Sequence, residues 1–458
     1  MGLFIQKISF SEVKNHPTHI DEITVVEIAY NIYKGEYNPG FFRYPAGYMN
    51  LLAFIFKIFS IFSDEMTIKG AYKISWCVSK IIIAVLPVMV FIICYFLGTY
   101  IIGIIGSFLA IFSGVMIQHS QVAVVDILLS FFCFLFFTIS VYWFKRSDIS
   151  LNKLIVLSSI IGISIAMKYT GAILILSLFF IINRFINQNI EFSGTKYFQI
   201  LFTGILGVGL FLIISLLLAN KEFVLQELAG LTTDGIIEIE YHNLLNKLIY
   251  LSLFISLGFM VLTYFIQMDK VNGLGKFISP LYLQLLIIVF FGFFLFSPFT
   301  ILEIKRSFAD FMYEYRHMQI GSAAQYHHQS QEYHTIVKNL DNLYPLRFYL
   351  KLFFYNFGKV GVAMAIVGIF GILKKEKFVE KIILVFLFLM TLTIVSWQNV
   401  ADRYTLSILP IIYVLIPFGI HWLSIFLENK VLPYHYLFTL LSFLTFLEPL
   451  LKWFNAIG

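Results

Sequence analysis

Apolar segments long enough to cross a lipid bilayer recur along almost the whole chain, and they constrain its fold more than any other feature. Of the 458 residues, 59% are hydrophobic and only 13% are charged, whereas a soluble domain has about 25% charged residues. A bilayer core about 30 Å thick is crossed by about 20 apolar residues in a helix. The sequence therefore predicts an all-α, polytopic integral membrane protein with about 11–13 transmembrane helices.

The expected spans follow one another with short connections. They cover about 71–97, 99–117, 122–144, 151–166, 168–186, 196–219, 244–268, 280–299, 348–373, 381–397, 404–427 and 434–454. The run 151–182 is divided because one helix of that length would be about 48 Å long and would bury Lys168 near mid-membrane. We see no repeat and no second soluble domain, so residues 1–458 are expected to form one transmembrane domain.

Two polar stretches interrupt this pattern. Residues 19–70 are predicted to form a first outer loop, with amphipathic helices over about 23–34 and 44–62 that lie in the membrane interface. A second loop, 300–347, is expected to be functional because loops of this length are uncommon in compact proteins. The three cysteines lie in apolar runs without metal or redox spacing, so we interpret them as packing residues.

Basic residues indicate the orientation, because short cytoplasmic loops carry an excess of Lys and Arg. Loops rich in basic residues alternate with loops that are poor in them, which are 118–126, 166–169, 220–243, 300–347 and 398–403. This alternation predicts that Asp21, Asp126, Lys168 and Arg403 all lie at helix ends on the outer face. An outer Asp21 has no helix before it. A short tail can cross the membrane unaided, but we expect instead that a first helix is missing from this chain.

The acidic residues of this set are candidates for catalysis. A carboxylate near the interface acts as a general base or binds a divalent ion, and Asp21, Glu22 and Asp126 qualify. For Asp126 the structural alternative is an acid stabilised by the dipole of the helix that it begins. For Asp21 and Glu22 the alternative is an ordinary charged cap of a loop.

The basic residues of the set are candidates for binding phosphate. Lys168 and Arg403 either pair with a carboxylate structurally or bind a lipid phosphate at the membrane surface, and Arg43 is a further phosphate candidate. The net charge of +6 is attributed to loop bias, since no dense basic run indicates nucleic acid. The loop 300–347, which we expect to close over a substrate, carries Glu314, Arg316, His317, His327, His328 and His334.

Several motifs in a fixed order resemble membrane glycosyltransferases of the GT-C fold, in the protein O-mannosyltransferase and aminoarabinose transferase group. They are HIDE, GEYNPGFFRYPAGYMNLLAF, QHSQVAVVDILLSFF, GISIAMKYTGAILI, FLFSPFTILE with EYRHMQIG, and ADRYTLSILP. The family uses a polyprenyl-phosphate sugar as donor. The resemblance therefore implies a cell-envelope enzyme of the outer face that transfers a sugar to an acceptor lipid, glycan or protein.

The resemblance also implies a role for each candidate residue. Asp21, with Glu22 beside it, matches the acidic residue of the first outer loop, and Asp126 matches the second acidic position; both are also candidate ligands of a divalent metal. The implied donor-phosphate residues are Arg43, Lys168, Arg403 and Tyr404. The implied substrate-loop residues are Tyr44, His119, Arg316 and His317. No nucleotide cofactor is expected, because the lipid carries the sugar.

The chain departs from the family at one motif and leaves other functions open. His119 lies where relatives often have an Arg-His-Ser step, but Gln118 replaces the Arg, which weakens a phosphate role there. The alternative function is a transporter or flippase for a lipid or small solute, which would place charges near mid-membrane and show paired repeats. An inactive scaffold subunit is a third reading. The gathering of charges at one face favours the enzyme.

Overall fold

The computed structural model describes residue 17 and residues 19–62, 66–146, 149–188, 280–325, 343–374, 378–428 and 433–457. Its elements are α2 (Ile20–Lys34), α3 (Gly47–Phe62), α4 (Ile68–Leu97), α5 (Tyr100–Ile111), α6 (Gly114–His119), α7 (Val125–Lys145), α8 (Leu151–Met167), η1 (Tyr169–Ile173), α9 (Leu174–Gln188), α13 (Pro280–Phe296), α14 (Phe299–Leu302), α15 (Ile304–Gln325), α17 (Tyr344–Lys374), α18 (Phe378–Val395), η4 (Asp402–Ser407), α19 (Leu409–Leu427) and α20 (Tyr434–Ile457). The described residues contain no strand, which confirms the all-α prediction.

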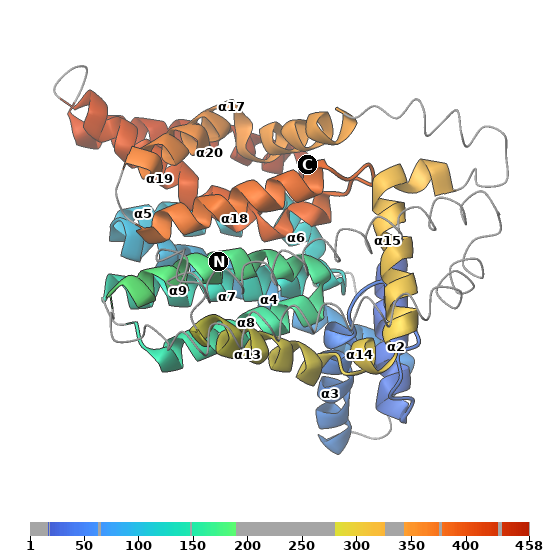
Figure 1. Ribbon diagram of the computed structural model, residues 1–458. Coiled ribbons are helices and arrows are strands. Elements are labelled where there is room, and N and C mark those ends of the chain that lie inside the picture. Colours follow the sequence, from blue (N-terminus) through green and yellow to red (C-terminus); the bar gives the residue numbers. More distant parts are fainter. Residues whose placement is uncertain are drawn as a thin grey trace.

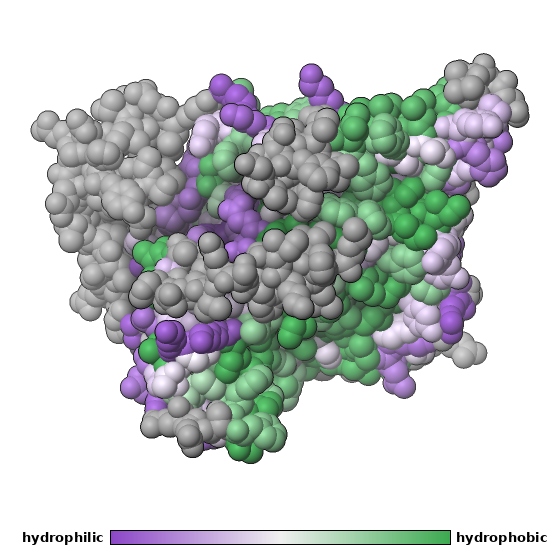
Figure 2. Space-filling model, turned by 180° about the vertical axis from the view of Figure 1, so that it is seen from behind, coloured by the Kyte–Doolittle hydropathy of each residue, from purple (hydrophilic) through white to green (hydrophobic). Residues whose placement is uncertain are grey.

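Apolar helices form the body of the molecule. Among the described helices, α4, α7, α17 and α19 are long and apolar enough to cross a membrane, and several shorter apolar helices accompany them. Figure 1 shows these helices running side by side, and Figure 2 shows a broad hydrophobic band over the same body. The arrangement is that of a polytopic membrane protein. The predicted spans 196–219 and 244–268 lie outside the described residues.

Glycines allow the closest helix crossings. In the crossing of α17 with α19, a Cβ on Gly419 would lie 1.8 Å from the carbonyl oxygen of Met364. In the crossing of α8 with α13, a Cβ on Gly162 would lie 2.2 Å from the carbonyl oxygen of Val289. Neither position accepts a larger residue without a shift of the backbone. Such close backbone packing is a main source of helix association in lipid.

The predicted break in the run 151–182 is confirmed. Helix α8 ends at Met167, and Lys168 has an extended backbone with φ −156° and ψ 137°. The 3₁₀ helix η1 follows and leads directly into α9. The lysine therefore lies at a helix end, as its charge requires, and not in the middle of a span.

One end of the bundle is covered by helices that run across it, and we call it the capped end. Figure 1 shows α2, α3 and α15 across this end. The predicted interfacial helices correspond to α2 and α3. The predicted loop 300–347 is helical as far as Gln325, because α15 occupies its first half, and residues 326–342 lie outside the described part.

The loop between α2 and α3 is fixed to the elements around it. The backbone N–H of Phe42 donates to Oδ2 of Asp310 in α15 at 2.7 Å, and the N–H of Ala46 donates to Oγ of Ser297 at 2.8 Å. From the other side, the N–H of Gln398 donates to the carbonyl oxygen of Met318 at 2.8 Å. Helix α15 therefore joins the first loop of the chain to the segment before η4.

Candidate functional site

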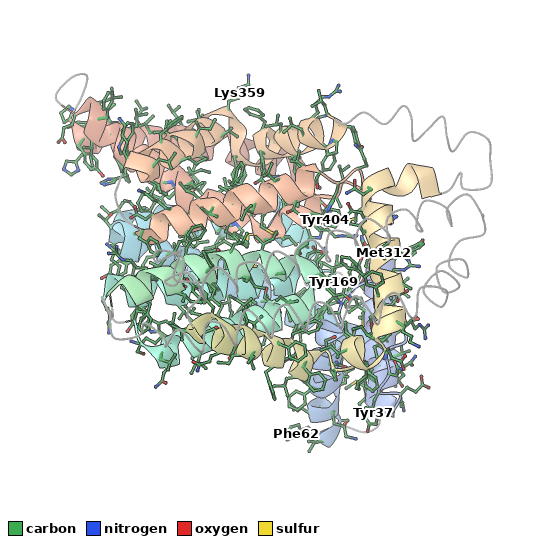
Figure 3. All side chains as sticks on the ribbon, viewed as in Figure 1. Tyr37, Phe62, Tyr169, Met312, Lys359 and Tyr404 are labelled. Carbon is green, nitrogen blue, oxygen red and sulfur yellow. The ribbon has the colours of Figure 1, made fainter. Side chains whose placement is uncertain are left out.

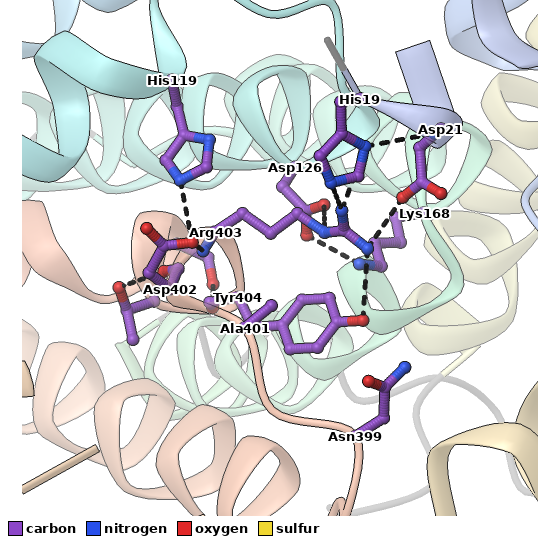
Figure 4. Close-up of polar contacts among 12 residues, drawn as sticks. His19, Asp21, His119, Asp126, Lys168, Asn399, Ala401, Asp402, Arg403 and Tyr404 are labelled. Atoms are coloured by element: carbon purple, nitrogen blue, oxygen red, sulfur yellow. Dashed lines mark hydrogen bonds and ion pairs between the residues drawn. The ribbon is translucent and has the colours of Figure 1, made fainter. Parts of the chain in front are cut away.

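Four of the residues singled out in the sequence meet at the capped end, as Figure 4 shows. One guanidinium nitrogen of Arg403 lies 2.8 Å from Oδ2 of Asp21. The Nε of Arg403 lies 3.8 Å from Oδ2 of Asp126, which is an ion-pair contact too long for a hydrogen bond. The Nζ of Lys168 lies 2.6 Å from Oδ1 of Asp126. The predicted convergence of these residues is therefore found in the structure.

Each of the four side chains projects from the end of a helix. Asp21 lies in the first turn of α2, and Asp126 lies in the first turn of α7, where the helix dipole stabilises a negative charge. Lys168 occupies the break between α8 and η1, and Arg403 is the second residue of η4. All four charged residues thus lie at helix ends and not in the middle of an apolar helix.

The cluster is balanced in charge and mostly buried. Two carboxylates face two cations, so the formal charge of these four side chains sums to zero. The side chain of Asp126 is 6% exposed and that of Lys168 is 8% exposed, whereas that of Asp21 is 21% exposed. Asp126 is therefore the inner carboxylate, and Asp21 is the one nearer to solvent.

His19 and Tyr404 complete the surroundings of Arg403. His19 contacts one terminal nitrogen of the guanidinium through Nε2, and its Nδ1 accepts from the backbone N–H of Asp21 at 3.1 Å. Burial and the positive charge of Arg403 lower the pKa of His19 below its ordinary value. The Tyr404 hydroxyl accepts from Arg403 at 3.4 Å, and its ring lies 4.7 Å from Nζ of Lys168.

A second pair supports Arg403 from the other side. The Nε2 of His119, at the end of α6, lies 3.1 Å from Oδ1 of Asp402. Asp402 also accepts from the backbone N–H of Arg403 at 2.8 Å. The His119 contact holds the pKa of the Asp402 carboxyl below its usual value. Here His119 contacts a carboxylate of the protein, so its predicted substrate role remains a prediction.

Glu22 lies next to Asp21 in sequence, and its hydrogen bonds go to α4 and to the segment before α7. Its side chain is fully buried and accepts hydrogen bonds from Nε1 of Trp76 and, at 3.0 Å, from the backbone N–H of Ala123. These bonds join α2 to α4 and to the segment before α7. They fix the position of α2, and the catalytic role expected for Glu22 from the sequence remains a prediction.

The other predicted site residues lie around the cluster. The Arg43 guanidinium stacks over the Tyr313 ring of α15 at 4.0 Å, and the Tyr44 ring lies 5.7 Å from Nζ of Lys168. The Nε2 of His317 lies 2.8 Å from Nδ2 of Asn399. Arg316 belongs to α15, but its side chain lies outside the described part of the structure.

Three residues near the cluster were not predicted as site residues. His19 and Asp402 contact Arg403 or its backbone, and Glu314 of α15 lies close enough to Lys168, Arg43 and Arg403 for their charges to affect its pKa. Asp402 directly precedes Arg403 in sequence, and this position next to a candidate residue was the signal from which it could have been predicted. His19 opens the HIDE motif, and Glu314 lies in the EYRHMQIG motif, so their membership of these motifs was the signal in the sequence.

The sequence suggests Asp21 and Asp126 as ligands of a divalent metal. Asp21 and Asp126 both face Arg403, and Lys168 occupies the second oxygen of Asp126. In the described part of the chain, no group of three His, Cys, Asp or Glu side chains is arranged to hold a metal ion. Two cations already neutralise the two carboxylates, so this arrangement does not fit a divalent ion.

No protein-family model and no curated protein matches this chain. Among solved structures, the oligosaccharyltransferase AglB from Archaeoglobus fulgidus, in complex with an inhibitory peptide and a dolichol-phosphate, gives a TM-score of 0.47 at 14% identity, covering 98% of this chain and 54% of that one. The apo form of the same enzyme gives a TM-score of 0.47 at 12% identity. This chain thus spans about half the length of the archaeal protein.

A second kind of enzyme was also found. ArnT from Cupriavidus metallidurans, in the apo state, gives a TM-score of 0.29 at 11% identity, covering 91% of this chain and 76% of that one. At identities of 11–14% and TM-scores of 0.29–0.47, neither assigns a substrate or a residue role to this chain.

Proposed function

We propose that this chain is a membrane glycosyltransferase that takes a sugar from a polyprenyl-phosphate donor. The observation that carries the proposal is the placement of Arg403 between Asp21 and Asp126, with Lys168 on the other oxygen of Asp126. A lipid-linked donor keeps its tail among apolar helices and its phosphate at the surface. The two cations lie at the capped end of the apolar bundle, which supports a position near such a phosphate.

The chemistry needs positive charge where the phosphate leaves. When the bond between the sugar carbon and the phosphate oxygen breaks, negative charge develops on the phosphate, and fixed cations stabilise it. Arg403 offers a planar set of donors that matches phosphate oxygens, and Lys168 adds a second charge. Asp126 holds both cations in place. Arg43, stacked on Tyr313, is a further cation within the same region.

A carboxylate must also accept the proton of the acceptor hydroxyl. The sequence predicts Asp21 for this role, and Asp21 is the more exposed of the two carboxylates in the cluster. Its contact with Arg403 at 2.8 Å gives it a second effect, because it aligns the guanidinium toward the centre of the cluster. Tyr44 and His317 lie beside the cluster and are proposed to contact the acceptor.

The capped end is proposed to face the outer side of the membrane. Basic residues mark the opposite ends of the same helices: Arg146 directly follows α7, Arg184 lies in α9 over the Phe378 ring, and Lys374 is the last residue of α17. Short loops with an excess of Lys and Arg remain in the cytoplasm. A donor reaching the cluster would then be used outside, for an acceptor lipid, glycan or protein of the cell envelope.

The experiment is transfer by the purified protein in liposomes that contain labelled polyprenyl-phosphate sugars and an acceptor membrane fraction. The expected result is free polyprenyl phosphate and labelled product, with both lost in Arg403→Ala. An exposed basic residue at the opposite end, changed as Arg146→Ala, is the matched control. Movement of intact donor across the bilayer without its cleavage would instead indicate a flippase and would contradict the proposal.

A further inference from the structure

One face of α15 is directed toward the cluster, and its register identifies a carboxylate that forms no ion pair with any residue that the structure describes. Asp310, Glu314 and Met318 are spaced by four residues and therefore lie on one side of the helix. Asp310 accepts from the Phe42 N–H at 2.7 Å, and the Tyr404 hydroxyl donates to the sulfur of Met318 at 3.8 Å. Glu314 lies between these two contacts, and so between the first loop and η4.

The surrounding contacts support this placement. The Phe311 ring of α15 meets the Tyr169 ring edge to face at 5.3 Å, and Figure 3 shows Met312, Tyr169 and Tyr404 in the same region. The Tyr169 hydroxyl donates to the carbonyl oxygen of Phe42 at 3.0 Å. Helix α15 is thus fixed against η1 and the first loop on one side of Glu314.

Charged groups from several neighbouring elements lie close enough to Glu314 to affect its pKa. Lys168 lies at the end of α8, Arg43 in the first loop, and Arg403 in η4; each of these cations favours the ionised carboxylate. Asp21 of α2 opposes ionisation, and the negative charge of Glu314 acts in turn on the hydroxyls of Tyr44 and Tyr404. No described residue forms a hydrogen bond or ion pair with the Glu314 carboxylate.

This environment distinguishes Glu314 from the carboxylates of the cluster. Asp21 and Asp126 each have an oxygen bound by a cation, at 2.8 and 2.6 Å. Burial of Glu314 outweighs the attraction of the three cations and raises its pKa to about 7. A carboxyl group with a pKa near the working pH exchanges protons most effectively as a general base or acid.

We propose that Glu314, and not Asp21 as the sequence predicts, is the catalytic residue that accepts the proton of the acceptor, while Asp21 and Asp126, whose oxygens are paired with Arg403 and Lys168, align the cations. The inference rests on the proposed glycosyl transfer. The acceptor oxygen forms a bond to the sugar carbon as the bond from that carbon to the phosphate oxygen breaks. The electron pair of the broken bond leaves with the phosphate, which Arg403 and Lys168 hold. The acceptor proton passes to the Glu314 carboxylate, and a carboxylic acid results.

The test is the dependence of kcat on pH for the full chain in liposomes with labelled polyprenyl-phosphate sugar. In the wild type, kcat should rise with pH through an apparent pKa of about 7, because the base must be unprotonated. Glu314→Gln should lower kcat by about 10²–10⁴-fold and remove that rise. Binding of polyprenyl phosphate without sugar should be unchanged, which shows that the variant is folded. Glu303→Gln, at an exposed position before α15, is the matched control.

A second variant covers the case in which Glu314→Gln does not fold. Glu314→Asp keeps a carboxylate on a shorter side chain, so it should retain part of the rate and shift the apparent pKa of kcat. A wild type that transfers sugar while Glu314→Gln keeps its rate and pH dependence would overturn the role of Glu314 alone. If the wild type transfers no sugar from any of the labelled polyprenyl-phosphate sugars, the proposed function is overturned, and the role of Glu314 with it.

Discussion

The guanidinium of Arg403 forms an ion pair with Asp21 at 2.8 Å, which joins the first described helix of the chain to the segment that leads into α19. The same guanidinium contacts Asp126 at the start of α7. One side chain thus connects three segments that lie far apart in the sequence. Its loss would separate the elements that form the cluster.

A double-mutant cycle on Arg403 and Asp21 tests this connection. Removing one partner of a buried ion pair costs about 3–5 kcal/mol, and Arg403→Ala should approach this range because it leaves two carboxylates without their shared cation. Asp21→Asn should cost less, since Asp21 is more exposed. The loss of unfolding free energy in the double variant should be smaller than the sum of the losses in the two single variants, by a coupling energy of about 0.5–3 kcal/mol. Denaturant unfolding in mixed micelles measures each free energy, and additive costs would contradict the pairing.

The contact of His119 with Asp402 should appear in the pH dependence of stability. His119 lowers the folded-state pKa of Asp402 from its ordinary value of 3.8, so the pair stabilises the fold above that pH and loses this effect as the pH falls further. His119→Phe should therefore be least stable relative to the wild type near neutral pH. The difference should shrink below about pH 4. His435→Phe, at an exposed position of α20, should show no such trend.

The raised pKa of Glu314 predicts a contribution to stability that changes with pH in the opposite direction to that of Asp402. A carboxyl whose folded-state pKa of about 7 exceeds its ordinary value of 4.5 stabilises the fold at low pH and loses that contribution as the pH rises to about 7. Glu314→Gln carries no charge to bury, so its stability relative to the wild type should increase between pH 4.5 and 7. Thermal unfolding at each pH measures the stability of the variant and of the wild type. If the difference between them stays constant across this range, Glu314 is solvated and the prediction is contradicted.

Much of the fold could be predicted because apolar length and charge position are local features. The break at Lys168 followed from a run too long for one span and from a charge that no bilayer core accommodates. The convergence of Asp21, Asp126, Lys168 and Arg403 followed from the alternation of basic loops. These arguments need only the distance along the chain and the cost of burying charge.

The remainder depends on tertiary contacts that no local pattern reveals. Helix α15 has little apolar character, so it was predicted as a loop, although Asp310 and Met318 fix it to segments far away in sequence. Glu22 lies next to Asp21, yet one side chain faces Arg403 and the other faces Trp76. Which of two adjacent acids enters the site is decided by the rotation of α2 against α4.

The close helix crossings predict a strong effect at Gly419. A Cβ there would lie 1.8 Å from a backbone oxygen of α17, so Gly419→Val forces the two helices apart. Overpacking of this kind costs about 1–3 kcal/mol, which thermal unfolding in detergent measures. Gly114→Ala is the control, because its Cβ would meet no atom within 4 Å. Equal stability of the two variants would contradict the packing of α17 on α19.

The orientation is tested by labelling single cysteines. In a Cys77→Ser background, which removes the exposed native cysteine, cysteines replace Glu36 at the capped end and Glu428 after α19. Both positions are exposed. An impermeant thiol reagent added to intact cells should label the cysteine at 36 and leave the one at 428 unlabelled until the membrane is opened. Labelling of both from outside would contradict the proposed topology.

The most direct test of the central claim is the affinity of the purified protein for polyprenyl phosphate without sugar, measured in lipid nanodiscs. A hydrogen bond to a charged group contributes about 1.5–3 kcal/mol, and 1.4 kcal/mol is about tenfold in affinity. Arg403→Gln and Lys168→Met should therefore each weaken binding by about tenfold or more. Lys374→Met, an exposed lysine at the opposite end, should bind like the wild type. Wild-type affinity in both cluster variants would show that these cations do not hold a phosphate.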